Sequence, residues 1–339
     1  MGTTELTVPY QLAFVASRDA KTRPPRPSRQ QRGRRSQVLG ALVVVAVVAI
    51  LNVVVWAGAP ARSARLVPAF GMVAVGSASP WQKVTVGNTA PNVGAPEVVL
   101  NVDDAAAYAA GRSLVGLVVV DRVTGTYLDN GSPTHTPMGS ASVVKVLIAE
   151  ELLYRASTGE LSLGASGSVR MESMLIASDD SAASSLYSQF GGPALIEAAL
   201  VRHHLSESAP PADPRYWGNT IITAHDVAKF YDNVLAGSIS TADQDYLFGL
   251  LRRIAPIASD GFDQRFGVNG IDTTSEAAVK QGWMCCLNDL RNVHSTAVLG
   301  PDDRYIVVIL TQYSAGLPYE YGQDTATEVA RLVVEELTL

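Results

Sequence analysis

A serine and a lysine three residues apart are the first pair in this sequence that could do chemistry. They lie in MGSASVVKVLIAEELLY, residues 138–154, where small residues give way to an apolar helical repeat. A serine hydroxyl needs a neighbouring base and donors for a developing oxyanion. Residues three apart share a helix face, so Lys145 can reach Ser142, and the helix N-terminus favours an anion. The pattern predicts a nucleophile at Ser142; the alternative is a helix cap.

Two further segments carry polar residues inside otherwise apolar sequence. MLIASDDSAASSLY, residues 174–187, contains a Ser-Asp-Asp triplet at 178–180, and VKQGW, residues 279–283, reads as a strand with a lysine and a glycine. In this order the three segments resemble the SxxK, Ser-Asp-Asn and Lys-Thr/Ser-Gly signatures of class A β-lactamases and related penicillin-binding proteins. The resemblance covers about Asp103 to Leu337.

The resemblance implies a role for each matching position. Ser142 would be acylated, Lys145 would accept its proton, and Ser178 would relay a proton to the leaving nitrogen. Asp179 would bind backbone amides, and Lys280 would orient Ser178 and a substrate carboxylate. Gly282 would admit the substrate backbone, and the amides of Ser142 and Trp283 would form the oxyanion hole. The family also implies a small substrate, either a β-lactam or a D-alanyl peptide.

Three positions near the motifs depart from the family pattern or could compensate for it. Asp180 replaces asparagine with a side chain that only accepts hydrogen bonds, so it could repel a substrate carbonyl or pair with Lys145. Gln281 replaces Thr or Ser, and its amide can still donate to a substrate. Arg291 is either a compensating carboxylate ligand or a solvated surface arginine.

The deacylation machinery of class A enzymes has no clear counterpart. Those enzymes activate water with a glutamate, but the corresponding stretch, SAPPADPRYWGNTIITAHDVAKF, offers only Asp213 before its family-like end. Asp213 is therefore the candidate base, with a surface turn as the alternative. Ser142 and Ser178 are close in sequence for this family, which predicts a reduced helical lobe. We expect acylation to outrun hydrolysis of the acyl-enzyme.

The N-terminal part of the chain predicts a membrane anchor. Residues 1–37 are basic and Pro-rich, which is typical of a disordered tail, and residues 38–57 form an uncharged apolar run of the length that a bilayer-spanning helix needs. Positive charge before the run predicts a cytoplasmic N-terminus and an extracytoplasmic remainder, with a cleaved signal peptide as the alternative. Residues 58–96 read as a stalk and residues 97–339 as the catalytic domain.

The order of elements predicts an α+β domain. A helix and a hairpin around RVTG precede the Ser142 helix, helical patterns follow at 172–176, 181–190, 193–202 and 225–235, and three strands and a helix over 324–337 end the chain. The two ends are expected to meet on one antiparallel sheet flanked by helices.

Composition and the remaining reactive residues narrow the function. The net charge of −6 disfavours a nucleic-acid partner. The five histidines show no HExxH spacing, so we expect no metal and no cofactor. The adjacent Cys285 and Cys286 form either a vicinal disulfide or two thiols, with two small buried hydrophobic residues as the alternative.

The sequence favours a membrane-anchored, exported serine hydrolase that forms an acyl-enzyme with β-lactams or D-alanyl peptides. Two alternatives stay open. One is a catalytically silent relative that binds cell-wall peptide or a protein partner through the same cleft; the other is an esterase or amidase that acts on a non-peptide substrate.

Overall fold

The computed structural model describes residues 100–271 and 276–337. The predicted tail (1–37), membrane helix (38–57) and stalk (58–96) lie outside these residues. Within the two described ranges, no helix combines the length and the apolar character needed to cross a membrane.

Five antiparallel strands form the central sheet in the order β2-β1-β7-β6-β5. Their bounds are β1 Leu114–Asp121, β2 Thr126–Asp129, β5 Ala278–Leu287, β6 Leu290–Leu299 and β7 Tyr305–Ser314. β1 pairs with β7 over eight residues, from Leu114 opposite Gln312 to Asp121 opposite Tyr305. The early hairpin and the late strands therefore share one sheet, which confirms that the two ends of the domain meet there.

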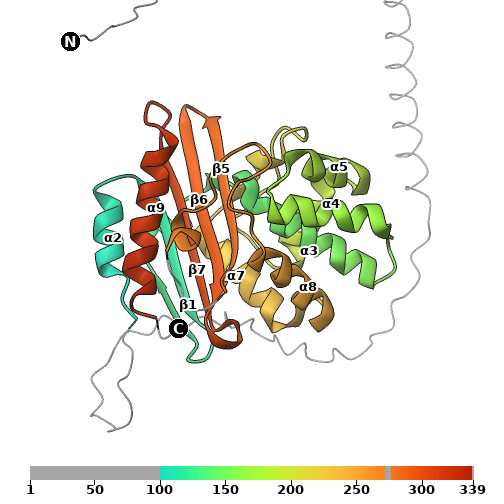
Figure 1. The fold of residues 1–339 in the computed structure, drawn as a ribbon, viewed down its shortest axis with the longest axis horizontal. Coiled ribbons are helices and arrows are strands. Elements are labelled where there is room, and N and C mark those ends of the chain that lie inside the picture. The colour runs from blue at the N-terminus through green and yellow to red at the C-terminus, as the bar shows by residue number, and fades with distance from the viewer. Residues whose placement is uncertain (1–99, 272–275, 338–339) are drawn as a thin grey trace, which may run out of the picture. The chain divides into compact units, whose positions relative to one another are not determined.

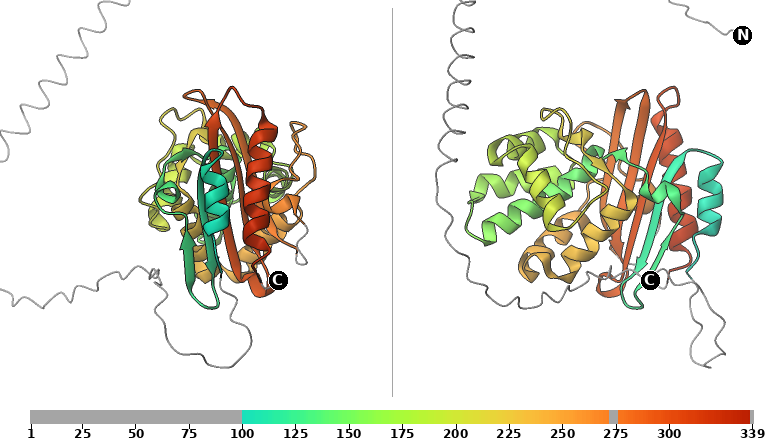
Figure 2. Two further views of the ribbon diagram at one scale, coloured as in Figure 1. Left: turned by 90° about the vertical axis from the view of Figure 1, so that its left-hand side faces the viewer. Right: turned by 180° about the vertical axis from the view of Figure 1, so that it is seen from behind.

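The sheet lies between two helical layers (Figures 1 and 2). α2 (Asp103–Ala110) and α9 (Tyr319–Val334) cover one face, and α9 begins five residues before the helix predicted at 324. Alternate residues of a strand face opposite sides, and β1 follows this rule: Leu117 and Val119 join the core under α9, whereas Val118 and Val120 join the core of the larger helical layer. The α+β prediction is confirmed.

The larger helical layer contains the Ser142 helix and the helices of the middle of the chain. Its members are α3 Val144–Ser157, α4 Gly164–Ile176, α5 Asp180–Phe190, α6 Pro193–Arg202, α7 Ala224–Asn233 and α8 Thr241–Arg252. α4 begins eight residues earlier than predicted, across a Gly- and Ser-rich turn, and α8 was not predicted. The Ser240 side chain begins α8 by accepting a hydrogen bond from the Asp243 amide.

A two-stranded ribbon connects the Ser142 turn to the loop that follows α6. β3 (Met138–Gly139) pairs with β4 (Ile221–Ile222), and the Ser140 amide donates to the Thr220 carbonyl at 2.7 Å. Short 3₁₀ turns flank the ribbon: η3 (Ser132–His135) and η4 (Ala141–Val143) lie before and after β3, and η5 (Trp217–Asn219) precedes β4. The 3₁₀ turn η7 (Gly267–Gly270) packs against α9, and η8 (Pro301–Asp303) joins β6 to β7.

Candidate active site

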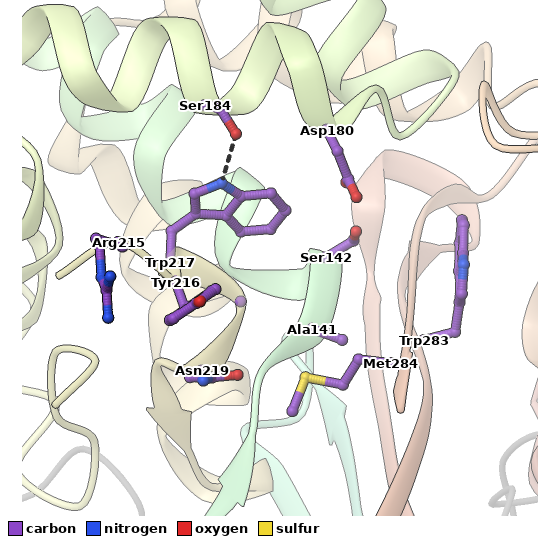
Figure 3. Close-up of a pocket in the computed structure, with 11 residues that line it drawn as sticks. Ala141, Ser142, Asp180, Ser184, Arg215, Tyr216, Trp217, Asn219, Trp283 and Met284 are labelled. Atoms are coloured by element: carbon purple, nitrogen blue, oxygen red, sulfur yellow. Dashed lines mark hydrogen bonds between the residues drawn. The ribbon is translucent and has the colours of Figure 1, made fainter. Parts of the chain in front are cut away.

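Ser142 lies in η4, two residues before α3, and lines a cavity of about 290 Å³ (Figure 3). The preceding residue, Ala141, has a φ of 46°, a left-handed conformation that costs energy outside glycine and concentrates at functional turns. Neither η4 nor α3 has a side-chain cap: Ser140 and Val143 hold the cap positions without such a bond. The alternative that Ser142 only caps the helix is wrong.

His294 of β6 supports the Ser142 turn from beneath. It is fully buried, and its Nδ1 accepts a hydrogen bond from the Thr311 amide at 3.1 Å, so its Nε2 carries the proton. Nε2 lies 2.8 Å from the Gly139 carbonyl, three residues before Ser142, and donates to it. Burial lowers the His294 pKa to about 4. A neutral imidazole thus fixes the backbone that leads to Ser142, a role that sequence patterns did not reveal.

Lys145 is fully buried one turn after Ser142, and its ammonium has three acceptors. Nζ donates to the Ser178 carbonyl at 2.6 Å, to Asp180 Oδ1 at 2.6 Å and to Ser178 Oγ at 3.3 Å. Among the residues that the structure describes, no hydrogen bond joins Lys145 to Ser142. Burial lowers the pKa of Lys145, and the Asp180 carboxylate opposes that shift. Of the two possibilities for Asp180, the structure has the ion pair with Lys145.

Ser178 lies between the two lysines of the motifs. Lys280 Nζ donates to Ser178 Oγ at 2.9 Å and to the Gln281 carbonyl at 2.8 Å. Lys280 is fully buried, and both desolvation and the nearby Lys145 lower its pKa far below the ordinary value. Ser178 itself has a φ of 51°, so the turn between α4 and α5 is held in a strained conformation that aims the hydroxyl at both lysines.

Asp179, the second residue of the Ser-Asp-Asp triplet, holds the turn between α4 and α5 through hydrogen bonds. The Asp179 carboxylate accepts hydrogen bonds from the amides of Ser181 and Ala182 at 2.8 and 3.0 Å and from the Ser173 hydroxyl at 2.8 Å. These bonds cap α5 and tie it to α4. Asp180, the next residue, is 69% exposed and points toward Ser142 across the pocket (Figure 3).

β5 approaches the Ser142 turn closely at Gly282. A Cβ added at Gly282 would lie 3.2 Å from the Ser142 amide nitrogen and 3.1 Å from a methyl group of Val143. β5 is one of the two edge strands of the sheet, and an edge strand leaves alternate amides free of ladder bonds. The Trp283 indole lines the pocket, stacks on Phe262 with centroids 4.5 Å apart, and donates to Asp260 at 2.9 Å.

The prediction that the Gln281 amide faces a substrate is wrong. Gln281 follows Lys280 on a strand, so its side chain points to the opposite face. It is fully buried there, and its Nε2 donates to the backbone carbonyls of Gln264 and Phe266. The amide fastens β5 to the segment before η7 and does not reach the pocket.

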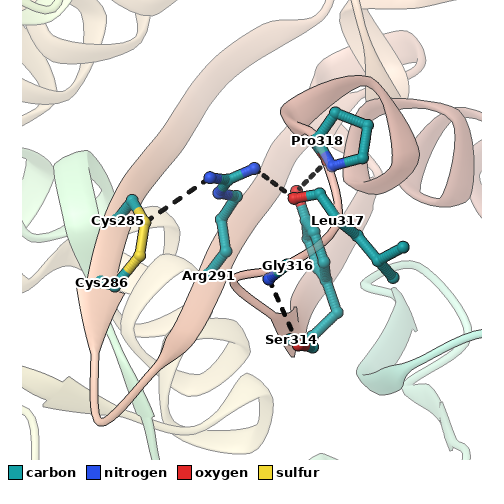
Figure 4. Close-up of a disulfide and its surroundings, with 8 residues drawn as sticks. Cys285, Cys286, Arg291, Ser314, Gly316, Leu317 and Pro318 are labelled. Atoms are coloured by element: carbon teal, nitrogen blue, oxygen red, sulfur yellow. Dashed lines mark hydrogen bonds between the residues drawn. A yellow bond between two sulfur atoms is a disulfide. The ribbon is translucent and has the colours of Figure 1, made fainter.

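The prediction that Arg291 binds a substrate carboxylate is also wrong. Its guanidinium donates to the Leu317 carbonyl, lies over the Tyr319 ring at 4.3 Å and contacts Cys285 Sγ at 3.6 Å (Figure 4). It is not among the residues that line the pocket. Arg291 is neither a substrate ligand nor a freely solvated arginine: it secures the loop after β7.

Cys285 and Cys286 are joined in a vicinal disulfide near the end of β5 (Figure 4). Both residues are exposed, so the alternative of two small buried hydrophobic residues is wrong. The disulfide directly follows Met284, whose side chain lines the pocket. β5 continues past the disulfide to Leu287, with a shift of register between Met284 and Leu287.

Asp213 is placed unfavourably for a deacylation base. Its carboxylate forms an ion pair with Arg215 at 2.6 Å, and these hydrogen bonds lower its pKa to about 2. Asp213 does not line the pocket, whereas Arg215 does. A carboxylate of such low basicity, turned to a surface arginine, is a poor proton acceptor, so the structure contradicts this assignment and supports the surface turn.

The loop after α6 instead supplies an aromatic wall that sequence reasoning missed. The Trp217 ring lies 4.9 Å from Lys145 Nζ, and its indole N–H donates to Ser184 at 3.1 Å (Figure 3). Tyr216 and Asn219 line the same wall. The run PRYWGN, between a Pro-rich turn and the family-like TIITAHDVAKF, was the available signal.

The arrangement can support acyl transfer. A recessed hydroxyl, two buried lysines of lowered pKa and a bridging serine provide a nucleophile and a route for its proton. Of the residues that line the pocket, only Asp180 carries a carboxylate, and it is paired with Lys145.

Comparison with known proteins gives a consistent family. Residues 165–337 match the model of the "Beta-lactamase enzyme family", a span that includes Ser178 and Lys280 and begins after Ser142. The chain is 38% identical over 225 residues to "Putative lipoprotein LppW" of Mycobacterium tuberculosis and of Mycobacterium bovis, covering 65% of this chain and 70% of each relative.

Solved structures share the fold at low sequence identity. An ancestral class A β-lactamase aligns with a TM-score of 0.54 and 19% identity over 71% of this chain and all of that chain. A β-lactamase from Xanthomonas campestris aligns with a TM-score of 0.56 and 17% identity over 70% of this chain and all of that chain. Identities this low establish the architecture alone.

Proposed function

Because this chain belongs to the β-lactamase enzyme family, we propose that it is a serine hydrolase in which Ser142 forms an acyl-enzyme with β-lactams or D-alanyl cell-wall peptides. The observation that carries the proposal is the Lys145–Ser178–Lys280 network beside Ser142, in which Ser178 Oγ lies 3.3 and 2.9 Å from the two lysine nitrogens. This network provides a path for a proton next to a pocket-lining hydroxyl.

Acylation in this geometry follows from the properties of the side chains. Neutral Lys145 takes the Ser142 hydroxyl proton as the Ser142 oxygen attacks the substrate carbonyl carbon. The backbone amides of Ser142 and Trp283 stabilise the oxyanion, because β5 approaches the turn at Gly282. The carbon–nitrogen bond then breaks, and Ser178 passes the proton from Lys145 to the leaving nitrogen.

Release of the acyl group is proposed to be slow. Hydrolysis needs a base that activates water, and the one carboxylate on the pocket wall, Asp180, is occupied by Lys145. Trp217, whose ring lies over the Lys145 ammonium, adds bulk where a water would have to approach. The chain should therefore accumulate acyl-enzyme with β-lactams.

A specific observation favours a second candidate, a catalytically silent module that binds peptide. The 2.6 Å pair with Asp180 stabilises the charged form of Lys145, which cannot accept the Ser142 proton. In this reading the pocket between Trp217 and Trp283 binds a cell-wall peptide or a protein segment without reacting. The two candidates differ in whether Ser142 becomes covalently modified.

We also propose that the domain is anchored outside the cytoplasm. The matched mycobacterial proteins are named as lipoproteins, and residues 38–57 of this chain form an apolar run preceded by basic residues. Deletion of 38–57 should move the protein from the membrane fraction to the soluble fraction of expressing cells. Retention of the deleted form in the membrane would contradict the anchor.

The deciding experiment is intact mass spectrometry of the full chain after incubation with benzylpenicillin. Wild type should gain the mass of one penicillin, Ser142→Ala should gain none, and Ser184→Ala, a second pocket serine, should still be modified. Nitrocefin turnover by the wild type should be limited to about one equivalent. Absence of an adduct on folded wild type would favour the silent module, and rapid multiple turnover would contradict slow deacylation.

A further inference from the structure

A cluster of metal-ligand side chains lies at the far end of the β3/β4 ribbon from Ser142. His135 ends η3, three residues before β3, and His225 lies in the first turn of α7, three residues after β4. Because Met138 pairs with Ile222 in an antiparallel ribbon, these two histidines are brought together. Glu207, from the loop after α6, completes the cluster.

The three ligand atoms converge. One nitrogen or oxygen from each of His135, Glu207 and His225 lies within 4.8 Å of the others. His135 Nδ1 is 2.9 Å from Glu207 Oε1, and His225 Nδ1 is 3.7 Å from Glu207 Oε2. Tetrahedral ligands about 2.1 Å from a zinc ion lie about 3.4 Å apart. The two separations bracket that spacing, so side-chain adjustments of about 1 Å or less bring the three atoms to it.

Hydrogen bonding inside the protein does not account for His225. Its Nδ1 is buried and has no hydrogen-bond partner among the residues that the structure describes. It lies 3.4 Å from Asp226 Oδ1, at ion-pair distance, but the two atoms form no hydrogen bond. An ion pair between His135 and Glu207 explains one imidazole, whereas the His225 nitrogen faces the Glu207 and Asp226 carboxylates without a hydrogen bond to either. A cation between them would use the His225 lone pair and offset the nearby carboxylates.

Outer contacts hold the carboxylate ligand in place. The buried Thr223 hydroxyl donates to Glu207 Oε2 at 2.9 Å. The other oxygen of Asp226, Oδ2, accepts the Glu207 amide and the Ser208 hydroxyl, each at 2.8 Å. Hydrogen bonds from neighbouring groups to a metal ligand orient that ligand and raise the metal affinity. The site is therefore built from positioned groups and not from freely rotating surface side chains.

We propose that His135, Glu207 and His225 bind one zinc ion, with the fourth position left to water. Two imidazoles and one carboxylate are a zinc ligand set. The ion would join the strand that leads to Ser142 with the strand that follows the Trp217 loop, because each histidine lies three residues beyond the ribbon. It braces the two pocket walls from the end opposite to the nucleophile and takes no part in the acylation chemistry.

The test is zinc binding by the full chain, purified in mild detergent and stripped with EDTA that is then removed. Zinc chloride is titrated in competition with a chromophoric chelator, and bound metal is counted after gel filtration. Wild type should bind one zinc per chain. At zinc 100-fold above the dissociation constant its melting temperature should rise by about 5–10 °C.

Matched variants assign the ligands. His135→Gln, Glu207→Gln and His225→Gln should each weaken binding at least about 100-fold, since loss of a mere outer partner already costs 10–100-fold. His204→Asn removes a surface histidine, at a φ of 55° that asparagine tolerates, and should bind like wild type. Circular dichroism in EDTA shows that each variant is folded.

Several results would overturn the zinc site: no binding by the wild type at micromolar zinc, binding that survives all three ligand variants, or equal loss in His204→Asn. None of these depends on whether Ser142 is acylated.

Discussion

Asp180→Asn should make the domain acylate faster at neutral pH, because it removes the anion that keeps Lys145 protonated. Lys145 Nζ and Asp180 Oδ1 are 2.6 Å apart. Asp180 is 69% exposed, so the interaction is screened as in water, where two unit charges at this distance attract by about 1.6 kcal/mol. Loss of that attraction lowers the Lys145 pKa further.

The consequence for the rate follows from the role of Lys145 as proton acceptor. Acylation needs the neutral amine, so the rate rises with pH and reaches half its plateau at the Lys145 pKa. In Asp180→Asn this midpoint should move to lower pH, and well below the midpoint the rate should increase about tenfold, the factor that corresponds to about 1.6 kcal/mol. The measurement is the rate of adduct formation with a fluorescent penicillin, from pH 5.5 to 9.5.

Asp245→Asn is the control, since it removes one exposed carboxylate from α8, remote in the chain from the three motifs. Its midpoint should equal that of the wild type. A midpoint that stays or rises in Asp180→Asn would refute the argument that the Asp180 carboxylate stabilises the protonated form of Lys145. A folded Asp180→Asn that forms no adduct would show instead that the Asp180 carboxylate is the base.

Three further changes test the surroundings of the site. Burial and the nearby Lys145 hold the Lys280 pKa well below its ordinary value, so the unfolded chain binds this proton more tightly than the folded chain. The free energy of unfolding of the wild type should therefore rise as the pH increases toward 10.5, and Lys280→Met should reduce that rise, by at most about 1.4 kcal/mol per pH unit, in urea unfolding. His294 has a pKa of about 4 in the folded protein and 6.5 in the unfolded chain, so the free energy of unfolding of the wild type should fall by about 3 kcal/mol as the pH falls from 6.5 to 4. His294→Gln should abolish this loss in the same assay, and a variant that is equally acid-sensitive would contradict the argument. Gly282→Ala places a methyl group 3.2 Å from the Ser142 amide nitrogen, so β5 must move by a few tenths of an ångström. Acylation should become about tenfold slower with little change in melting temperature, and an unchanged rate would refute the argument that β5 must approach closely.

Local sequence patterns were sufficient for the sheet and for the positions of the three motifs. The β-branched runs of β1, β6 and β7 and their turns specify strands through packing that repeats every second residue. The same alternation predicts where the Gln281 side chain lies. Consecutive strand residues face opposite sides of the sheet, and the Lys280 side chain faces Ser178, so the Gln281 side chain faces away from it. The resemblance to a Lys-Thr-Gly motif outweighed that signal.

Contacts between distant segments could not be read in the same way. Trp217 and His294 reach the site across 72 and 149 residues from Lys145, and neither belongs to a motif. Their positions depend on how the ribbon β3/β4 and the strand β6 pack against the Ser142 turn. Arg291 was predicted near the site but is held elsewhere. Its guanidinium donates to the Leu317 carbonyl, and the sequence gives no sign that this loop lies beside Arg291.

The energetics of the two lysines favour the enzyme over the silent module. Burying a cation costs several kcal/mol unless its partners compensate, and apolar residues of similar size often give a more stable protein. Here Lys145 and Lys280 are both fully buried around one hydroxyl; burial lowers the pKa of each, and Lys145 lowers the pKa of Lys280 further. A pocket that only holds a peptide gains nothing from amines of lowered pKa, whereas proton transfer at neutral pH requires them. Lys280→Met should therefore unfold no more easily than wild type at pH 7 and still lose acylation, and a variant that is destabilised but fully reactive would reverse the inference.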